Sequence, residues 1–107
     1  MGTQLLLTVE EFKRLPEDGF RHELSEGQLV AMPPPQASYS LIARQVFIQL
    51  FMGPEQAGLG KVVTEMAYRL SPGTVRVPDV SFLLHTQLQR IPGEGYFEGA
   101  PDLNIAT

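Results

Sequence analysis

Residues 75–84 read VRVPDVSFLL, an apolar run with Pro78 and Asp79 at its centre. Runs of β-branched and aromatic residues of this length are typical of a strand inside a sheet. A carboxylate in such a run is almost never buried without a partner. Asp79 therefore has two explanations, a metal ligand or an acid held by backbone amides or by an arginine such as Arg76.

The neighbouring segments predict two hairpins. Residues 61–70 pair with 75–84 around the turn SPGT at 71–74. Residues 20–24 and 28–32 form the other hairpin, around Ser25-Glu26-Gly27, where glycine supplies a positive φ. The prolines at 33–35 predict a rigid connector, because proline cannot donate to a ladder. Residues 87–99 predict an exposed loop and residues 102–105 the start of a last strand.

Two helices complete the pattern. Residues 8–15 begin with a capping box of Thr8 and Glu11 and end before Pro16. Residues 36–52 carry apolar side chains at helical spacing and predict the main helix, which Gly53-Pro54 ends. The order of elements predicts an α/β fold class, a mixed α+β sheet packed by two helices, in a single domain of residues 1–107.

Composition narrows the class of protein. The 107 residues include no cysteine, which excludes disulfides and thiolate metal sites and favours a cytoplasmic protein. The N-terminus has no basic segment, and Leu5-Leu6-Leu7 is too short for export or membrane insertion, so we expect no membrane partner. A net charge of −4 argues against a simple DNA-binding domain, because such affinity grows with the number of lysines and arginines.

Several other catalytic and binding classes lack support. His22 and His85 have no histidine or cysteine three to five residues away, so neither predicts a zinc site. The serines lack a G-x-S-x-G setting, and neither a P-loop nor a dinucleotide-binding fingerprint occurs. Lys61 and Arg69 flank a predicted strand, where isolated basic residues usually discourage strand addition.

Five short segments together resemble one known family. They are, in chain order, RHEL at 21–24, GQLV at 27–30, MPPP at 32–35, VPDVSF at 77–82 and GAPDL at 99–103. The combination is similar to the putative restriction endonuclease family of short bacterial proteins, within the PD-(D/E)XK nuclease superfamily, and spans most of the chain. The resemblance implies a restriction-endonuclease-like core, a divalent metal (Mg²⁺ or Mn²⁺) at one end of the sheet, and DNA as substrate.

The resemblance also implies site residues. Asp79 matches the metal-binding acid of the family, and Glu23 matches the acid near the first hairpin. Both are expected to bind the metal and to be catalytic. Glu65, in the strand that precedes Asp79, is a third catalytic candidate because it can face the same cleft. The alternatives are an exposed hairpin carboxylate for Glu23 and a solvent-facing strand acid for Glu65.

The sequence departs from the family pattern in two places. The family continues from the Pro-Asp-Leu segment to a glutamate and then a lysine, whereas Ala106 stands at the glutamate position and the sequence ends at Thr107. Tyr39 stands where the family helix often begins with a histidine. Loss of one strong electrostatic stabiliser commonly costs about 100-fold to 1,000-fold in rate. We therefore expect a core whose C-terminal part is missing, and a weak or inactive nuclease.

A second function stays open from the sequence. A chain that keeps this fold without catalysis would act as a structural or interaction module. An unfinished final strand leaves an open sheet edge, which favours pairing with a second copy. Under this alternative the protein is a homo-oligomer that self-associates through that edge.

Overall fold

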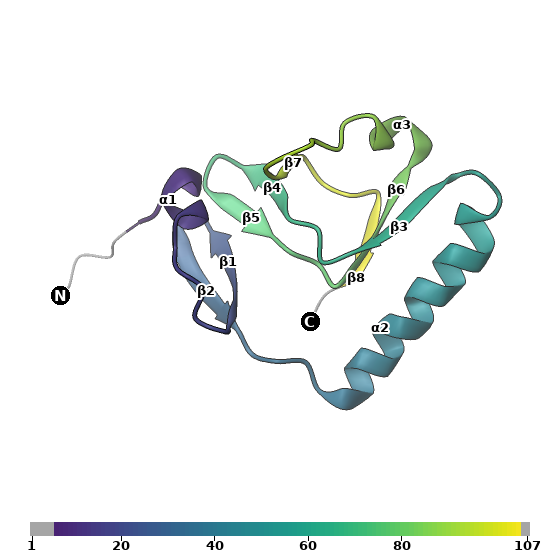
Figure 1. Cartoon of the computed structure of the whole chain (residues 1–107), viewed down its shortest axis with the longest axis horizontal. Helices are drawn as coiled ribbons and strands as arrows, with labels where there is room; N and C mark the ends of the chain where they lie inside the picture. The colour runs from purple at the N-terminus through teal and green to yellow at the C-terminus, as the bar shows by residue number, and fades with distance from the viewer. Residues whose placement is uncertain (1–5, 106–107) are drawn as a thin grey trace.

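The computed structural model describes residues 6–105, which form two sheets and a long helix (Figure 1). The five-stranded sheet has the order β2-β1-β5-β4-β7, and the three-stranded sheet has the order β3-β6-β8. The elements in chain order are α1 (Val9–Lys13), β1 (Arg21–Ser25), β2 (Gln28–Met32), α2 (Ala37–Leu50), η1 (Phe51–Glu55), β3 (Gly60–Thr64), β4 (Tyr68–Ser71), β5 (Thr74–Arg76), β6 (Val80–Leu84), α3 (His85–Leu88), β7 (Phe97–Glu98) and β8 (Leu103–Ile105). The predicted fold class is confirmed, because β4 and β7 are parallel while the other pairs are antiparallel.

The N-terminal segments follow the predicted pattern closely. Thr8 caps α1, and the reciprocal hydrogen bonds with Glu11 form the expected capping box. Strands β1 and β2 pair from Arg21 with Met32 to Ser25 with Gln28. The two intervening residues, Glu26 and Gly27, have φ of 48° and 83°. Two positive φ values define the turn type that matches the twist of a two-residue hairpin.

The second hairpin exists but is interrupted, and the interruption divides the two sheets. β3 pairs with β6 as far as Thr64 with Val80, and β4 pairs with β5 from Tyr68 with Arg76. The two ladders keep one register, since each strand advances four residues between these pairs. The prediction of two continuous strands is therefore wrong at residues 65–67 and 77–79. Pro78 explains part of the break, because it has no N–H to donate to a ladder.

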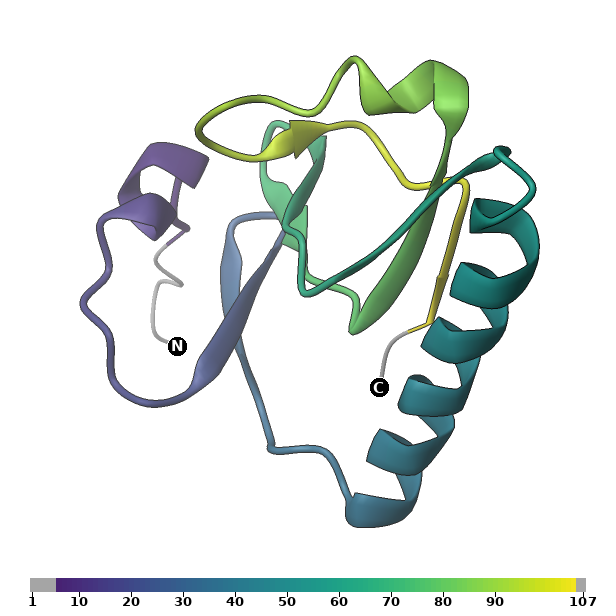
Figure 2. The same ribbon diagram turned by 45° about the vertical axis from the view of Figure 1, so that its right-hand side comes forward.

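Helix α2 lies along the three-stranded sheet (Figures 1 and 2). Its inner face packs on a buried cluster of Val62, Val80 and Phe82, through Ala43, Val46, Phe47 and Leu50. Leu41 and Ile42 are also apolar, but they lie away from this face and are 66% and 56% exposed. Apolar residues cover more than one side of this helix, so spacing alone does not determine which side is buried.

The predicted helix end at Gly53-Pro54 is also wrong. The chain continues through one π-helical turn, η1, which contains Pro54. The amide of Gln56 donates to the Phe51 carbonyl at 3.2 Å, and the wider turn accommodates a residue that has no N–H. No helix within residues 6–105 is long and apolar enough to cross a membrane.

Residues 87–99 are not simply the exposed loop that the sequence predicts. The end of α3 and the short strand β7 lie in this segment, and Phe97 is only 1% exposed. Phe97 packs with Tyr68 and with Leu83 of β6, in a cluster that joins the two sheets. The Tyr68 hydroxyl and the Ser81 hydroxyl share a buried hydrogen bond of 2.5 Å across the same junction.

Substitutions at two glycines test how closely β3 and β6 approach each other. A Cβ added at Gly60 would meet the Leu83 carbonyl oxygen, so Gly60→Ala is expected to lower the free energy of unfolding by about 1–3 kcal/mol. A Cβ at Gly53, within η1, would meet nothing within 4 Å. Gly53→Ala is therefore the matched control, expected to be neutral or stabilising by up to about 1 kcal/mol. Urea unfolding measures both; equal effects would contradict the close approach of β3 and β6.

Candidate active site

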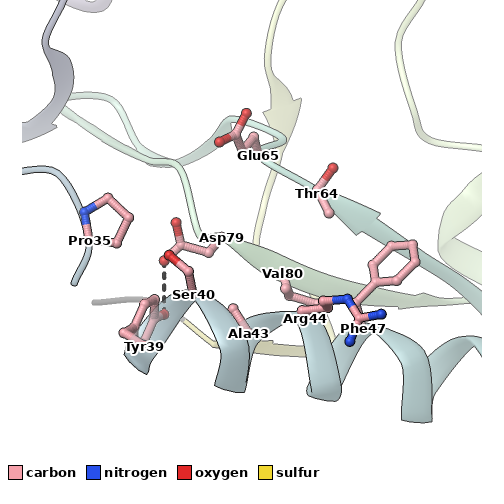
Figure 3. A pocket seen from close by; sticks show the side chains of 10 residues that line it. All are labelled: Pro35, Tyr39, Ser40, Ala43, Arg44, Phe47, Thr64, Glu65, Asp79 and Val80. Atoms are coloured by element: carbon pink, nitrogen blue, oxygen red, sulfur yellow. Dashed lines mark hydrogen bonds between the residues drawn. The ribbon is translucent and has the colours of Figure 1, made fainter. Parts of the chain in front are cut away.

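Asp79 lies at the interruption of the hairpin, directly before β6. Its carbonyl accepts the Glu65 amide at 3.3 Å, and its amide donates to Ile105 at 3.1 Å. The side chain is 14% exposed and lines a cleft of about 510 Å³ between the end of β3 and the first turns of α2 (Figure 3). Asp79 is thus a backbone-anchored acid at the junction of the two sheets.

Arg21 and Tyr39 both bond to the Asp79 carboxylate. Arg21 Nη1 donates to Oδ1 at 2.7 Å, and the Tyr39 hydroxyl donates to Oδ2 at 2.8 Å. Arg21 also donates through Nη2 to the Val77 carbonyl. Of the two explanations that the sequence left open, the structure thus contains the arginine partner. The arginine is Arg21 rather than Arg76.

Glu65 shares the cleft with Asp79. Figure 3 shows the two side chains on the same side of α2, with Glu65 at the end of β3. Arg21 Nη1 lies 3.9 Å from Glu65 Oε1, so one guanidinium faces both acids. Glu65 has a φ of 51°, a left-handed conformation that costs about 1–3 kcal/mol in a non-glycine residue. Backbone strain of this kind is frequent at functional sites.

Glu23 lies outside the cleft that Asp79 and Glu65 share. It is 9% exposed, accepts a hydrogen bond of 2.7 Å from the Val77 amide, and lies 4.0 Å from Arg76 Nε. It lines a separate cavity of about 330 Å³ with Tyr68 and Asn104. The structure therefore brings Glu65 to Asp79, whereas Glu23 braces the backbone two residues before Asp79.

The surroundings of Asp79 determine whether it can bind a divalent metal. Mg²⁺ binds oxygen ligands at about 2.0–2.1 Å and keeps several waters. Here a guanidinium nitrogen already occupies the position beside Oδ1, and Oδ2 is held by Tyr39. No group of three His, Asp or Glu side chains able to hold a metal occurs between residues 6 and 105. In this arrangement the residues do not fit a bound divalent cation. Ala106, at the expected second-acid position, lies outside the described residues.

Arg21 and Tyr39 are site residues to which the sequence assigned no role. Strand alternation places Arg21 and Glu23 on one face of β1, which is a signal that they act together. Tyr39 stands where the family helix often has a histidine, and its hydroxyl supplies a polar contact to Asp79. No spacing rule connects either residue to Asp79, which is 58 residues beyond Arg21.

The environment of Tyr39 keeps its hydroxyl protonated. Burial, and then the hydrogen bond and negative charge of Asp79, raise the pKa of Tyr39 to about 12. A phenol with a raised pKa is a donor at every physiological pH. The hydroxyl therefore holds the Asp79 carboxylate in one orientation.

Removing the Asp79 charge tests this coupling. Asp79→Asn is expected to lower the pKa of Tyr39 from about 12 part of the way to 10, because burial persists while the charge is lost. The pKa is higher in the folded state, so the stability from Tyr39 is complete below pH 10 and is lost as pH rises to about 12. In the variant this loss begins at lower pH. NMR titration of ¹³C-labelled tyrosine measures the shift, with Glu65→Gln as the control; an unchanged pKa would contradict the contact.

Comparison with known proteins identifies the family of this chain. The family described as "Uma2: Putative restriction endonuclease" matches residues 9–105. A crystal structure described as a putative nuclease belonging to DUF820, from Anabaena variabilis ATCC 29413, is 25% identical to this chain with a TM-score of 0.77. The match covers 94% of this chain and 57% of that chain, so the chain spans little more than half the length of that nuclease structure. No curated protein matches the sequence. The match over residues 9–105 confirms the resemblance, and the chain belongs to the putative restriction endonuclease family.

Proposed function

We propose that this protein is a DNA endonuclease that hydrolyses phosphodiester bonds at the Asp79 cleft and requires Mg²⁺ or Mn²⁺. The reaction adds water to phosphorus and breaks one P–O ester bond, which leaves a phosphate monoester and a free hydroxyl. Asp79 is the proposed metal-binding acid and Glu65 the proposed second acid. Glu23 contributes by holding the Val77 amide at 2.7 Å, which fixes the segment that carries Asp79.

The observation that carries the proposal is the facing of two acids in one cleft. The Glu65 amide bonds to the Asp79 carbonyl at 3.3 Å, so the two residues stand opposite each other where the hairpin is interrupted. The cleft, of about 510 Å³, is also lined by Arg44 and Ser40 of α2. Mg²⁺ is commonly held by one or two carboxylates together with substrate phosphates, so the proposal requires Arg21 to leave Asp79 before the two acids can serve as ligands.

The expected activity of this chain is low. Ala106 supplies no oxygen ligand where the family has a glutamate, and the guanidinium of Arg21 has to leave Asp79 before a metal binds there. Both features reduce the electrostatic stabilisation of the transition state.

Cleavage of supercoiled plasmid DNA tests the proposed function. Wild-type protein is expected to nick the plasmid slowly in Mn²⁺ and not in EDTA, and Asp79→Asn is expected to lose about 100-fold or more of this rate. Glu94→Gln is the matched control, because Glu94 is an exposed acid outside the cleft. Equal nicking by wild-type protein and Asp79→Asn, or cleavage unaffected by EDTA, would contradict the proposal.

A silent self-associating module is the second candidate. The sequence predicts self-association at the edge formed by the last strand, which is β8 of the three-stranded sheet. The observation that favours self-association is instead the apolar exposure of β2, which pairs with β1 at one edge of the five-stranded sheet. Leu29 and Val30 are 44% and 39% exposed on this edge strand. Exposed apolar edge strands pair readily with another chain.

Light scattering tests the second candidate. Self-association through β2 predicts a dimer for the wild-type protein. It predicts a monomer for Leu29→Lys, because a lysine on an edge strand opposes strand addition. Leu41→Lys, on the exposed side of α2, is expected to remain a dimer. A well-folded wild-type monomer would exclude self-association through β2.

A further inference from the structure

The cavity that Glu23 lines is separate from the cleft of Asp79. It has a volume of about 330 Å³, and no residue lines both. Strands β1, β4 and β5 of the five-stranded sheet and β8 of the three-stranded sheet each supply a side chain to it. Pockets of about 300 Å³ and more hold small molecules in proteins. The cavity therefore has room for a ligand the size of a nucleobase.

Glu23 contributes an acceptor with unused capacity to this cavity. The residue is 9% exposed, and its Oε2 accepts the Val77 amide at 2.7 Å. Its Oε1 accepts no hydrogen bond from residues 6–105 and lies 4.0 Å from Arg76 Nε, which is too far for a hydrogen bond. Since a carboxylate can accept several hydrogen bonds, Oε1 is open to an N–H donor of a ligand.

Arg76 supplies a donor beside this oxygen. Its Nη1 donates to the Leu24 carbonyl at 2.8 Å, and its Nη2 donates to the Ser25 hydroxyl at 3.1 Å. Both contacts fix the guanidinium on β1, whereas its Nε–H makes no hydrogen bond within residues 6–105. An acceptor and a donor thus lie 4.0 Å apart without being bonded to each other.

The other lining side chains suit a flat heterocycle. Leu70, Pro78 and Pro101 supply apolar surface to the cavity. Asn104 adds an exposed side-chain amide from β8. Apolar walls with a few polar groups are the usual composition of a small-molecule site.

We propose that this cavity binds a guanine base. The N1–H of guanine donates to Glu23 Oε1, and the adjacent O6 accepts from Arg76 Nε. The 2-amino group of guanine adds a second donor on the side of the carboxylate. Thymine fits less well, because it carries a carbonyl on each side of its N–H and one of them would face the carboxylate. The proposal goes beyond the proposed function, since it needs neither Asp79 nor a metal.

NMR titration of the full 107-residue chain with guanosine 5′-monophosphate, in EDTA, tests the site without any metal. Binding is expected to shift the backbone amide of Val77 and the side-chain amide of Asn104. Adenosine 5′-monophosphate has the same ribose and phosphate but carries an acceptor at N1, so it is expected to bind about tenfold more weakly. Equal binding of the two nucleotides would indicate recognition of ribose or phosphate and overturn the proposal.

Glu23→Gln tests the role of the open oxygen. Glutamine keeps one oxygen to accept the Val77 amide and places an NH₂ donor where Oε1 stood, so the fold is expected to persist. Binding of guanosine 5′-monophosphate is expected to weaken about tenfold or more, because a donor then faces N1–H. Wild-type affinity in Glu23→Gln would overturn the proposal.

Glu55→Gln is the matched control. Glu55 also accepts a backbone amide, that of Val62 at 2.9 Å, but it does not line the cavity. The same change of charge is therefore expected to leave nucleotide binding as in wild-type protein. An equal loss in Glu55→Gln would indicate a general charge effect and overturn the assignment to Glu23.

The remaining outcomes also decide the proposal. No shift at millimolar guanosine 5′-monophosphate would mean that only water fills the cavity, which overturns it. If circular dichroism shows that Glu23→Gln does not fold, Leu70→Trp narrows the cavity without changing the carboxylate and is expected to abolish binding. Unchanged binding in Leu70→Trp would overturn the proposed location. None of these results depends on plasmid cleavage, which tests the Asp79 cleft.

Discussion

The geometry of the cleft depends on how the backbone of Val77 is satisfied where the hairpin is interrupted. Buried N–H and C=O groups are nearly always paired, and the ladder ends one residue earlier, at Arg76. Glu23 accepts the Val77 amide and Arg21 donates to the Val77 carbonyl, so one strand supplies both partners. Loss of either partner leaves a part-buried polar group of Val77 without its hydrogen bond, which costs about 1 kcal/mol. The same two side chains thus fix the segment that presents Asp79 to the cleft.

Much of the fold was predictable from local signals in the sequence. The capping box of α1, the hairpin of β1 and β2, and the pairing of the two segments of the interrupted hairpin all depend on residues close together in the chain. The burial of Phe97 and the side of α2 that faces the sheet were not predictable, because both depend on contacts between distant segments. The π-helical turn at Pro54 escaped prediction because proline ordinarily ends a helix.

The residues of the site were also only partly predictable from the sequence. The position of Asp79 within an apolar run marks it as a candidate site residue, and the family resemblance implies that it is a metal-binding acid. Its partners Arg21 and Tyr39 come from β1 and α2, which only the folded chain brings together. Alternation along β1 places Arg21 and Glu23 on one face, but it does not show which acid or amide each side chain reaches. Glu65 reached the Asp79 cleft because the hairpin register places it opposite Asp79.

The single hairpin that runs through both sheets has a mechanical consequence. Bending it at residues 65–67 and 77–79 would change the angle between the sheets without breaking a ladder bond in either sheet. The buried Tyr68–Ser81 hydroxyl pair and the contact of Leu83 with Phe97 bridge the sheets beside this point. These two contacts oppose such bending, so they fix the angle between the sheets where the ladders are interrupted.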